Sequence, residues 1–105
     1  MAMSQFHKGM KFRSLREVQV RGVVAYGAPY STGFDGTLPV GEILVCSQEP
    51  GPRGMWLVPE RYKHFEQLFV PEQVRQNPDY GGYAVECLFS QIGQDYEMVG
   101  EKAAT

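Results

Sequence analysis

Two cysteines and two histidines are the residues of this sequence best suited to nucleophilic or metal chemistry. Cys46 and Cys87 each lie inside an apolar, strand-like run, whereas a reactive thiolate needs a partly exposed, electropositive setting. We therefore interpret both cysteines as small buried hydrophobic residues. His64 follows Glu60 by four residues, a spacing that would let the two side chains pair on one helical turn. We predict no catalytic residue and keep an enzyme that uses His64 or a cysteine as an alternative.

The same residue types make a metal or cofactor site unexpected. A metal site needs three or more ligands at suitable spacing, and the histidines and cysteines form no closely spaced pair. The second histidine, His7, lies in a polar segment at the N-terminal end of the sequence. We accordingly predict no metal and no cofactor.

The stretch TGFDGTLPVGEILVCS, residues 32–47, has three glycines ahead of an apolar run and raises the question of a phosphate loop. Such a loop needs Lys and Ser or Thr after the glycines, followed by a helix. Here Gly41 is followed by Glu42, whose charge would repel a phosphate, and then by a run with strand character. We interpret Asp35-Gly36 as a turn, and residues 28–37 as a long loop.

Aromatic residues give the clearest indication of a binding surface, with one Trp, six Tyr and six Phe in the chain. Tyrosines at loop edges are typical of binding surfaces, where the ring is buried and the hydroxyl stays in water. We predict a ligand site between the long loop and the start of a helix. Its apolar walls would be Tyr30, Phe34 and Trp56, and its orienting polar groups Asp35, Arg21 and Tyr62.

Five segments have strand character, and a sixth is a weaker candidate. Residues 17–25 (EVQVRGVVA) show it best, because their valines alternate with polar residues and valine suits a pleated surface. EILVCS and GMWLVP are apolar on both faces and read as a hairpin around QEPGPRG. The others are residues 10–13, YAVECLF and the short YEMV.

One helix is predicted over residues 59–69. Pro59 suits the first helical position, the aromatic and leucine side chains recur at spacings of three and four, and Pro71 stops the helix. A single helix cannot cover both faces of a flat sheet. We therefore predict an α+β fold: a strongly bent antiparallel sheet or small open barrel of about five strands with one helix.

Length and charge restrict the class of protein that this sequence can form. The 105 residues, 43% hydrophobic and 21% charged, fit a single domain. We expect it to span residues 10–99, between flexible tails at 1–9 and 100–105. The net charge of −2 and scattered basic residues disfavour nucleic acid. We expect no membrane partner, since no apolar run approaches about 20 residues, and a cytoplasmic location.

At LPVGEILVC, MWLVPERYKHFEQLFVP and VRQNPDYGGYAV the chain resembles small uncharacterised bacterial proteins of the integron, or mobile gene cassette, kind. The shared pattern is Leu-Pro-x-Gly, an apolar strand, a Pro-x-x-Tyr helix start, a Val-Pro stop and a Tyr-Gly-Gly-Tyr-like turn. These motifs are structural, so no catalytic residue is transferred. The resemblance implies a bacterial cytoplasmic protein, often oligomeric and sometimes with a small-molecule pocket.

Taken together, these features favour a binding or interaction module over an enzyme. A sheet that is apolar on both faces but has only one helix leaves apolar surface uncovered, and a homodimer would bury it. Two alternatives stay open beside the small-molecule pocket. One is an antitoxin- or immunity-like regulator that binds another protein, and the other is the small enzyme named above.

Overall fold

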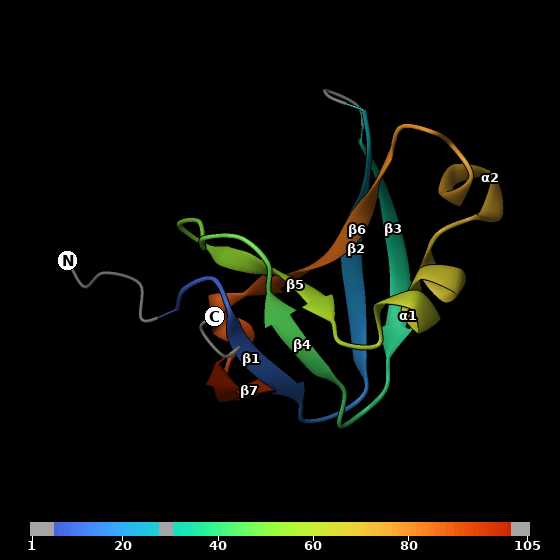
Figure 1. The fold of residues 1–105 in the computed structure, drawn as a ribbon. Helices are drawn as coiled ribbons and strands as arrows, with labels where there is room; N and C mark the ends of the chain where they lie inside the picture. Colours follow the sequence, from blue (N-terminus) through green and yellow to red (C-terminus); the bar gives the residue numbers. More distant parts are fainter. Residues whose placement is uncertain (1–5, 28–30, 102–105) are drawn as a thin grey trace.

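One open antiparallel sheet makes up most of the molecule (Figure 1). The computed structural model describes residues 6–27 and 31–101. Its seven strands run in the order β3-β2-β6-β5-β4-β1-β7, and every neighbouring pair is antiparallel. The α+β class and the open antiparallel sheet are therefore confirmed, whereas the predicted count of about five strands is wrong.

The strands are β1 (Met10–Ser14), β2 (Val18–Tyr26), β3 (Ser31–Leu38), β4 (Ile43–Cys46), β5 (Gly54–Pro59), β6 (Tyr80–Leu88) and β7 (Tyr96–Glu101). Helix α1 (Tyr62–Phe69) is followed by a four-residue helix, α2 (Glu72–Arg75), and a 3-10 turn, η1 (Phe89–Gln91), follows β6. Within the described residues, no helix is long and apolar enough to cross a bilayer.

The strand that sequence reasoning missed is β3. The predicted turn at Asp35-Gly36 is wrong, because both residues lie inside this strand, which pairs with β2 from Val18–Leu38 to Ala25–Ser31. The glycine-rich composition of β3 is typical of turns. At Gly36 the cause is packing against an aromatic ring, as described below. The turn itself comes later, at Gly41, which has a φ of 85°.

Helix α1 begins later than predicted. Pro59 pairs with Leu44 and ends β5, so it is not the first helical residue. The backbone N–H of Glu60 then donates to the Ile43 carbonyl at 2.9 Å, which extends the ladder one residue further. The helix starts at Tyr62 and ends at Phe69. The end at Phe69, two residues before Pro71, is the predicted one.

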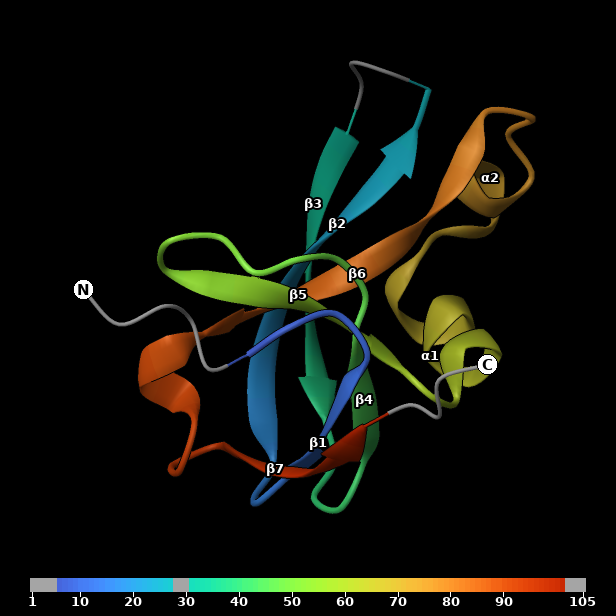
Figure 2. The ribbon, with the colours of Figure 1, turned by 60° about the vertical axis from the view of Figure 1, so that its left-hand side comes forward.

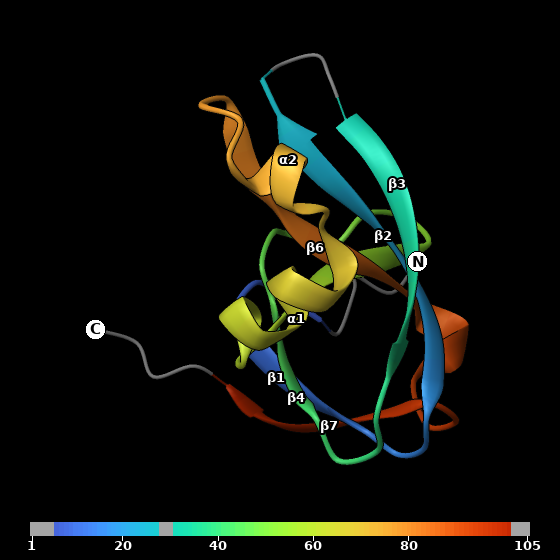
Figure 3. The same ribbon diagram turned by 90° about the vertical axis from the view of Figure 1, so that its right-hand side faces the viewer.

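The sheet divides between β5 and β6. Their register runs only from Gly54–Leu88 to Leu57–Val85, whereas β2 stays paired with β6 as far as Tyr80. The two halves of the sheet consequently diverge, and α1 lies in the opening between them, in contact with β3 and β5 (Figure 3). Figure 2 shows the same division from another side, with β6 crossing beneath β5.

The core lies between the inner face of the bent sheet and α1. The valine face predicted for residues 17–25 is confirmed, since Val18, Val20 and Val24 are all buried. From the helix side, Phe65 and Phe69 complete the core, and Phe69 stacks on Phe34 of β3 with ring centroids 5.1 Å apart.

Glycines receive the aromatic rings of this core. A Cβ added at Gly36 would lie 2.3 Å from the Phe69 ring, and one at Gly22 would lie 2.3 Å from the Phe34 ring. Both distances are far below van der Waals contact. The two glycines therefore allow the rings to lie directly against the backbone of β2 and β3.

Both ends of the predicted domain continue into ordered contacts. Phe6 stacks on Phe89 with centroids 5.4 Å apart and lies against Phe12. At the other end, β7 pairs with β1 as far as Glu101. Residues 1–5, 28–30 and 102–105 lie outside the described part of the chain.

Replacing Gly36 by alanine tests the packing of Phe69 against β3. We expect Gly36→Ala to lower the free energy of unfolding by about 1–3 kcal/mol, because the added methyl overpacks the core. Gly33→Ala on the same strand is the matched control, since its Cβ would meet only the Gly22 carbonyl at 3.6 Å. Urea denaturation measures both, and equal losses at the two positions would contradict the packing described here.

Candidate functional site

The outward face of the sheet, which is turned away from the core, carries a row of three half-buried residues, two of which are apolar. The register pairs Lys11 with Val45 and Val45 with Val58, so these three side chains cross β1, β4 and β5 side by side. Val45 and Val58 are only partly covered, although their strand neighbours are buried. This face is the spare apolar surface that sequence analysis anticipated.

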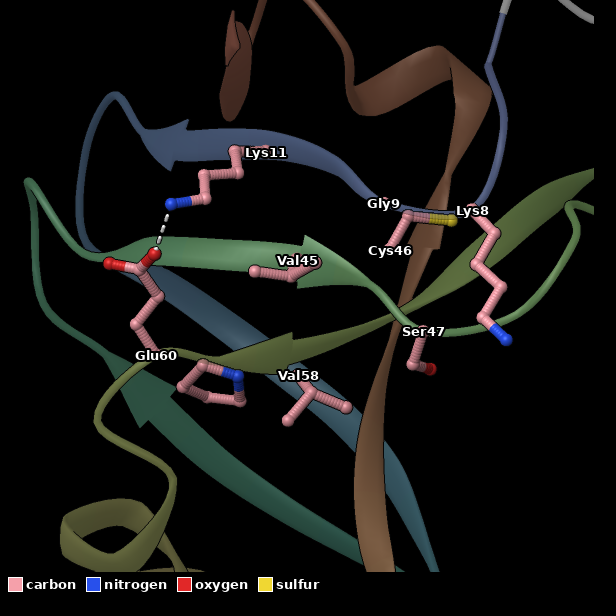
Figure 4. Close-up of a pocket in the computed structure, with 9 residues that line it drawn as sticks. Lys8, Gly9, Lys11, Val45, Cys46, Ser47, Val58 and Glu60 are labelled. Atoms are coloured by element: carbon pink, nitrogen blue, oxygen red, sulfur yellow. Dashed lines mark ion pairs between the residues drawn. The ribbon is translucent and has the colours of Figure 1, made fainter. Parts of the chain in front are cut away.

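A pocket of about 610 Å³ opens over this row, and we call it the Lys11 pocket (Figure 4). Val45 and Val58 line its middle. Lys11 and Glu60 mark one end, and Lys8 and Ser47 mark the other. Its volume falls within the range of about 300–1,000 Å³ that is common for small-molecule sites.

The two ends of the Lys11 pocket differ in their charge. Lys11 Nζ lies 2.7 Å from Glu60 Oε2, and both side chains stay partly exposed, so this ion pair closes one end with little net charge. At the other end, the Ser47 hydroxyl donates to the Trp56 carbonyl at 3.2 Å. The described residues place no carboxylate within ion-pair distance of Lys8.

A tight turn fixes the backbone that carries Lys8. Gly9 has a φ of 97°, which favours glycine, and Met10 N–H donates across the turn to the His7 carbonyl at 3.2 Å. Gly9 N–H donates to the Cys46 carbonyl at 2.9 Å and so attaches the turn to the end of β4. The backbone at Lys8 is therefore held beside the pocket by the hydrogen bonds of its neighbours, whereas the Lys8 side chain is exposed.

A second pocket adjoins the first, and a third adjoins the second. The Tyr62 pocket, of about 320 Å³, lies where β5 and β6 diverge and shares Ser47 and Val58 with the Lys11 pocket. The Trp56 pocket, of about 410 Å³, shares Gln48 with the Tyr62 pocket. The β4–β5 connection thus borders all three pockets.

A directed chain of hydrogen bonds fixes Tyr62 at the edge of its pocket. Tyr83 N–H donates to Tyr62 Oη at 3.1 Å, and Tyr62 Oη lies 3.2 Å from Tyr80 Oη. Tyr80 Oη donates to Glu66 Oε2 at 2.5 Å. Because the Tyr80 proton is directed at Glu66, the Tyr62 hydroxyl is the donor in the Tyr62–Tyr80 bond.

Burial keeps the Tyr80 and Tyr83 hydroxyls protonated. Burial, with the hydrogen bond to Glu66 second, raises the pKa of Tyr80 above its ordinary range. Burial also raises the pKa of Tyr83, whose hydroxyl donates to the Tyr62 carbonyl at 2.9 Å. Tyrosines that stay protonated donate hydrogen bonds, and through these bonds the chain positions Tyr62 and α1.

Of the predicted ligand residues, three lie on the outward face and outside the Lys11 pocket. Arg21 and Asp35 are cross-strand partners with 3.7 Å between Arg21 Nε and Asp35 Oδ1, and both side chains are more than four-fifths exposed. Trp56 is half-buried in the Trp56 pocket, opposite Glu86.

The remaining predicted residues do not join these three. Tyr62 lines the Tyr62 pocket, whereas Phe34 packs on the core side against Phe69 and Tyr83. Tyr30 lies outside the described residues. The six residues were predicted to converge between a loop and the helix start. Those that the structure describes lie instead on both sides of the sheet, and Trp56 and Tyr62 line different pockets.

The thiols and the imidazole do not form a nucleophilic site. Cys46 and Cys87 are both buried and free, which confirms the interpretation as core residues. Burial, with the Asp95 charge second, raises the pKa of Cys87 from 9.0 to about 12. Burial likewise raises the pKa of Cys46, whose thiol donates to the Gln48 carbonyl at 3.0 Å. Glu60 pairs with Lys11 rather than with His64, which is exposed on α1.

Sequence reasoning missed the residues that build the Lys11 pocket. Lys11 gave a partial signal, because a lysine that alternates with buried Met10 and Phe12 has to face outward. Glu60 was assigned to the helix, and Lys8 to a tail. Their convergence depends on the β1–β4–β5 register, which one sequence does not show.

The fold and pockets therefore define a small α+β domain with a bent open sheet and a pocketed outward face. No protein-family model, curated protein or solved structure matches the chain. Among the described residues, no three His, Cys, Asp or Glu side chains are grouped so as to hold a metal ion.

Removing the Tyr80 hydroxyl tests the hydrogen-bond chain. We expect Tyr80→Phe to lower the free energy of unfolding by about 1–3 kcal/mol, because buried Glu66 loses a donor. Tyr26→Phe is the control: Tyr26 is the cross-strand partner of Tyr80 and has no hydroxyl partner among the described residues. Urea denaturation at pH 7 compares the two variants, and an equal effect would contradict the chain.

The raised pKa of Cys87 predicts a loss of stability at alkaline pH. Above pH 9.0 the thiol ionises in the unfolded chain, whereas in the folded protein it keeps its proton up to about pH 12. The unfolded state then binds fewer protons, so stability falls as pH rises through this window, by at most about 1.4 kcal/mol per pH unit for this one group.

Cys87→Ala isolates this contribution. We expect the destabilisation caused by Cys87→Ala to be largest at pH 7–8 and to shrink between pH 9 and 11. Val85→Ala, a truncation of a second fully buried residue on β6, should cost the same at every pH. Urea denaturation across this pH range measures both, and a pH-independent cost for Cys87→Ala would contradict the assignment.

Proposed function

We propose that this protein is a small-molecule binding module whose ligand occupies the Lys11 pocket. The observation that carries the proposal is the pocket itself, which combines an apolar middle at Val45 and Val58 with charged groups at its two ends. Ligand sites typically have this mixture, in which apolar area supplies affinity and a few polar groups fix orientation.

The surrounding structure supports binding rather than catalysis. Both cysteine thiols are buried, and the exposed His64 lies outside the pocket, so neither a reactive thiolate nor an imidazole is presented to a ligand there. The backbone around the pocket is fixed by the β1–β4–β5 ladder and by the turn at Gly9. A preorganised site of this kind loses little conformational entropy on binding.

A ligand screen with a pocket variant tests the proposal. We expect compounds from a metabolite library to raise the melting temperature and to shift the amide NMR signals of Val45 and Val58. Val58→Asp, which places a carboxylate on the apolar wall, should weaken every such ligand at least tenfold. Val40→Asp is the matched control, because Val40 is 63% exposed and lines none of these pockets.

The same variants separate the small-molecule proposal from the predicted homodimer, which would use the same outward face. Sedimentation velocity of the wild type and of Val58→Asp gives the native mass of each. A library without hits, together with a dimer that Val58→Asp dissociates, would overturn the small-molecule proposal in favour of self-association. A monomer that binds library compounds only with Val58 intact would support it.

A further inference from the structure

We infer that the ligand of the Lys11 pocket is a small organic carboxylate with an apolar body, oriented with its acid group toward Lys8. The inference rests on the function proposed above and adds the chemical class of the ligand. It follows from the charges that line the pocket, from their spacing and from the apolar surface between them.

The charge of the pocket favours an anion. Two lysines and one glutamate line it, and Glu60 is already paired with Lys11 at 2.7 Å. One positive charge, at Lys8, therefore stays uncompensated by any described residue. A carboxylate beside this ammonium group would form a charge-assisted hydrogen bond, which is stronger than a neutral one.

The position of Lys8 gives the ligand its direction. Lys8 and Ser47 lie at one end of the pocket and the Lys11–Glu60 pair at the other, with Val45 and Val58 between (Figure 4). Ser47 is two residues beyond Val45, the partner of Lys11, which corresponds to about 7 Å along the strand. A body about as long as a short alkyl chain or a single ring spans this distance.

The apolar middle sets the rest of the ligand. The side chains of Val45 and Val58 offer no hydrogen bond, so polar atoms placed over them would lose their water without replacement. An inorganic anion or a highly hydroxylated acid fits this surface poorly. An aliphatic or aromatic monocarboxylate meets both requirements, since its apolar carbons cover the valines and its acid group reaches Lys8.

Three probes with the same phenylpropyl body and different charge test the inference: 4-phenylbutanoate, its isostere 4-phenylbutanamide, and 4-phenylbutylamine. Binding to the full chain is followed by NMR shift titration of Val45 and Val58 at low salt. We expect the carboxylate to bind about three- to tenfold more tightly than the amide, and the amine to bind most weakly. The preference of the carboxylate over the amide should shrink as salt is added.

Lys8→Gln assigns the preference to Lys8. This variant should lower carboxylate affinity to that of the amide and leave amide affinity unchanged, a pattern that misfolding would not produce. Arg21→Gln is the control, because it removes the same charge from an exposed outward-facing residue that lines none of the three pockets.

The outcomes separate this inference from the proposed function. Equal binding of all three probes, or tighter binding of the amine, with Val58→Asp abolishing it, would overturn the carboxylate class and leave a small-molecule pocket in place. Absence of binding by the carboxylate at millimolar concentration would also overturn it, whatever the library screen finds. Failure of that screen would overturn the proposed function itself.

Discussion

The docking of α1 into the division of the sheet is the constraint on which the rest of this structure depends. The register between β5 and β6 covers only Gly54–Leu57 and Val85–Leu88, so two bent halves share a short seam. A helix of eight residues fills the opening beside that seam. The ring of Phe69 on this helix lies against the backbone of Gly36. The helix also buries a carboxylate, that of Glu66, which is 6% exposed.

This docking joins apolar and polar contacts that depend on one another. The stacked rings of Phe34, Phe65 and Phe69 bring α1 close to β3, and only at that distance do glycines become necessary. The hydrogen bonds from Tyr83 through Tyr62 and Tyr80 to Glu66 then fix the rotation of the helix. Satisfied buried networks of this kind specify a single arrangement where apolar packing alone would permit several.

The parts of the fold that could be predicted are those with local causes. Alternation of valines identified β2, and Pro71 marked the end of α1 correctly, because both effects act within a few residues. Gly36 of β3 misled the prediction because its cause is Phe69, more than thirty residues away. Pro59 misled the prediction for a similar reason, since it pairs with Leu44, which lies outside any short stretch of sequence around Pro59.

The candidate site was harder to predict from the sequence than the fold. Alternation places Trp56 on the opposite face of its strand from Met55 and Leu57. In contrast, the placement of Lys8, Ser47 and Glu60 around one pocket depends on three strands in register.

The connection between β4 and β5 has a consequence for how such a domain could diversify. Ser47 lines both the Lys11 pocket and the Tyr62 pocket. Gln48 lines the Tyr62 pocket and, with the loop that follows it, the Trp56 pocket. This segment nevertheless lies outside the hydrophobic core. The hydrogen bond from Gly51 N–H to the Gly54 carbonyl closes the loop locally. Changes in its length or composition would therefore reshape the three cavities together while the sheet beneath them stayed intact. Substitutions in this loop could therefore change which ligand is bound without destabilising the fold.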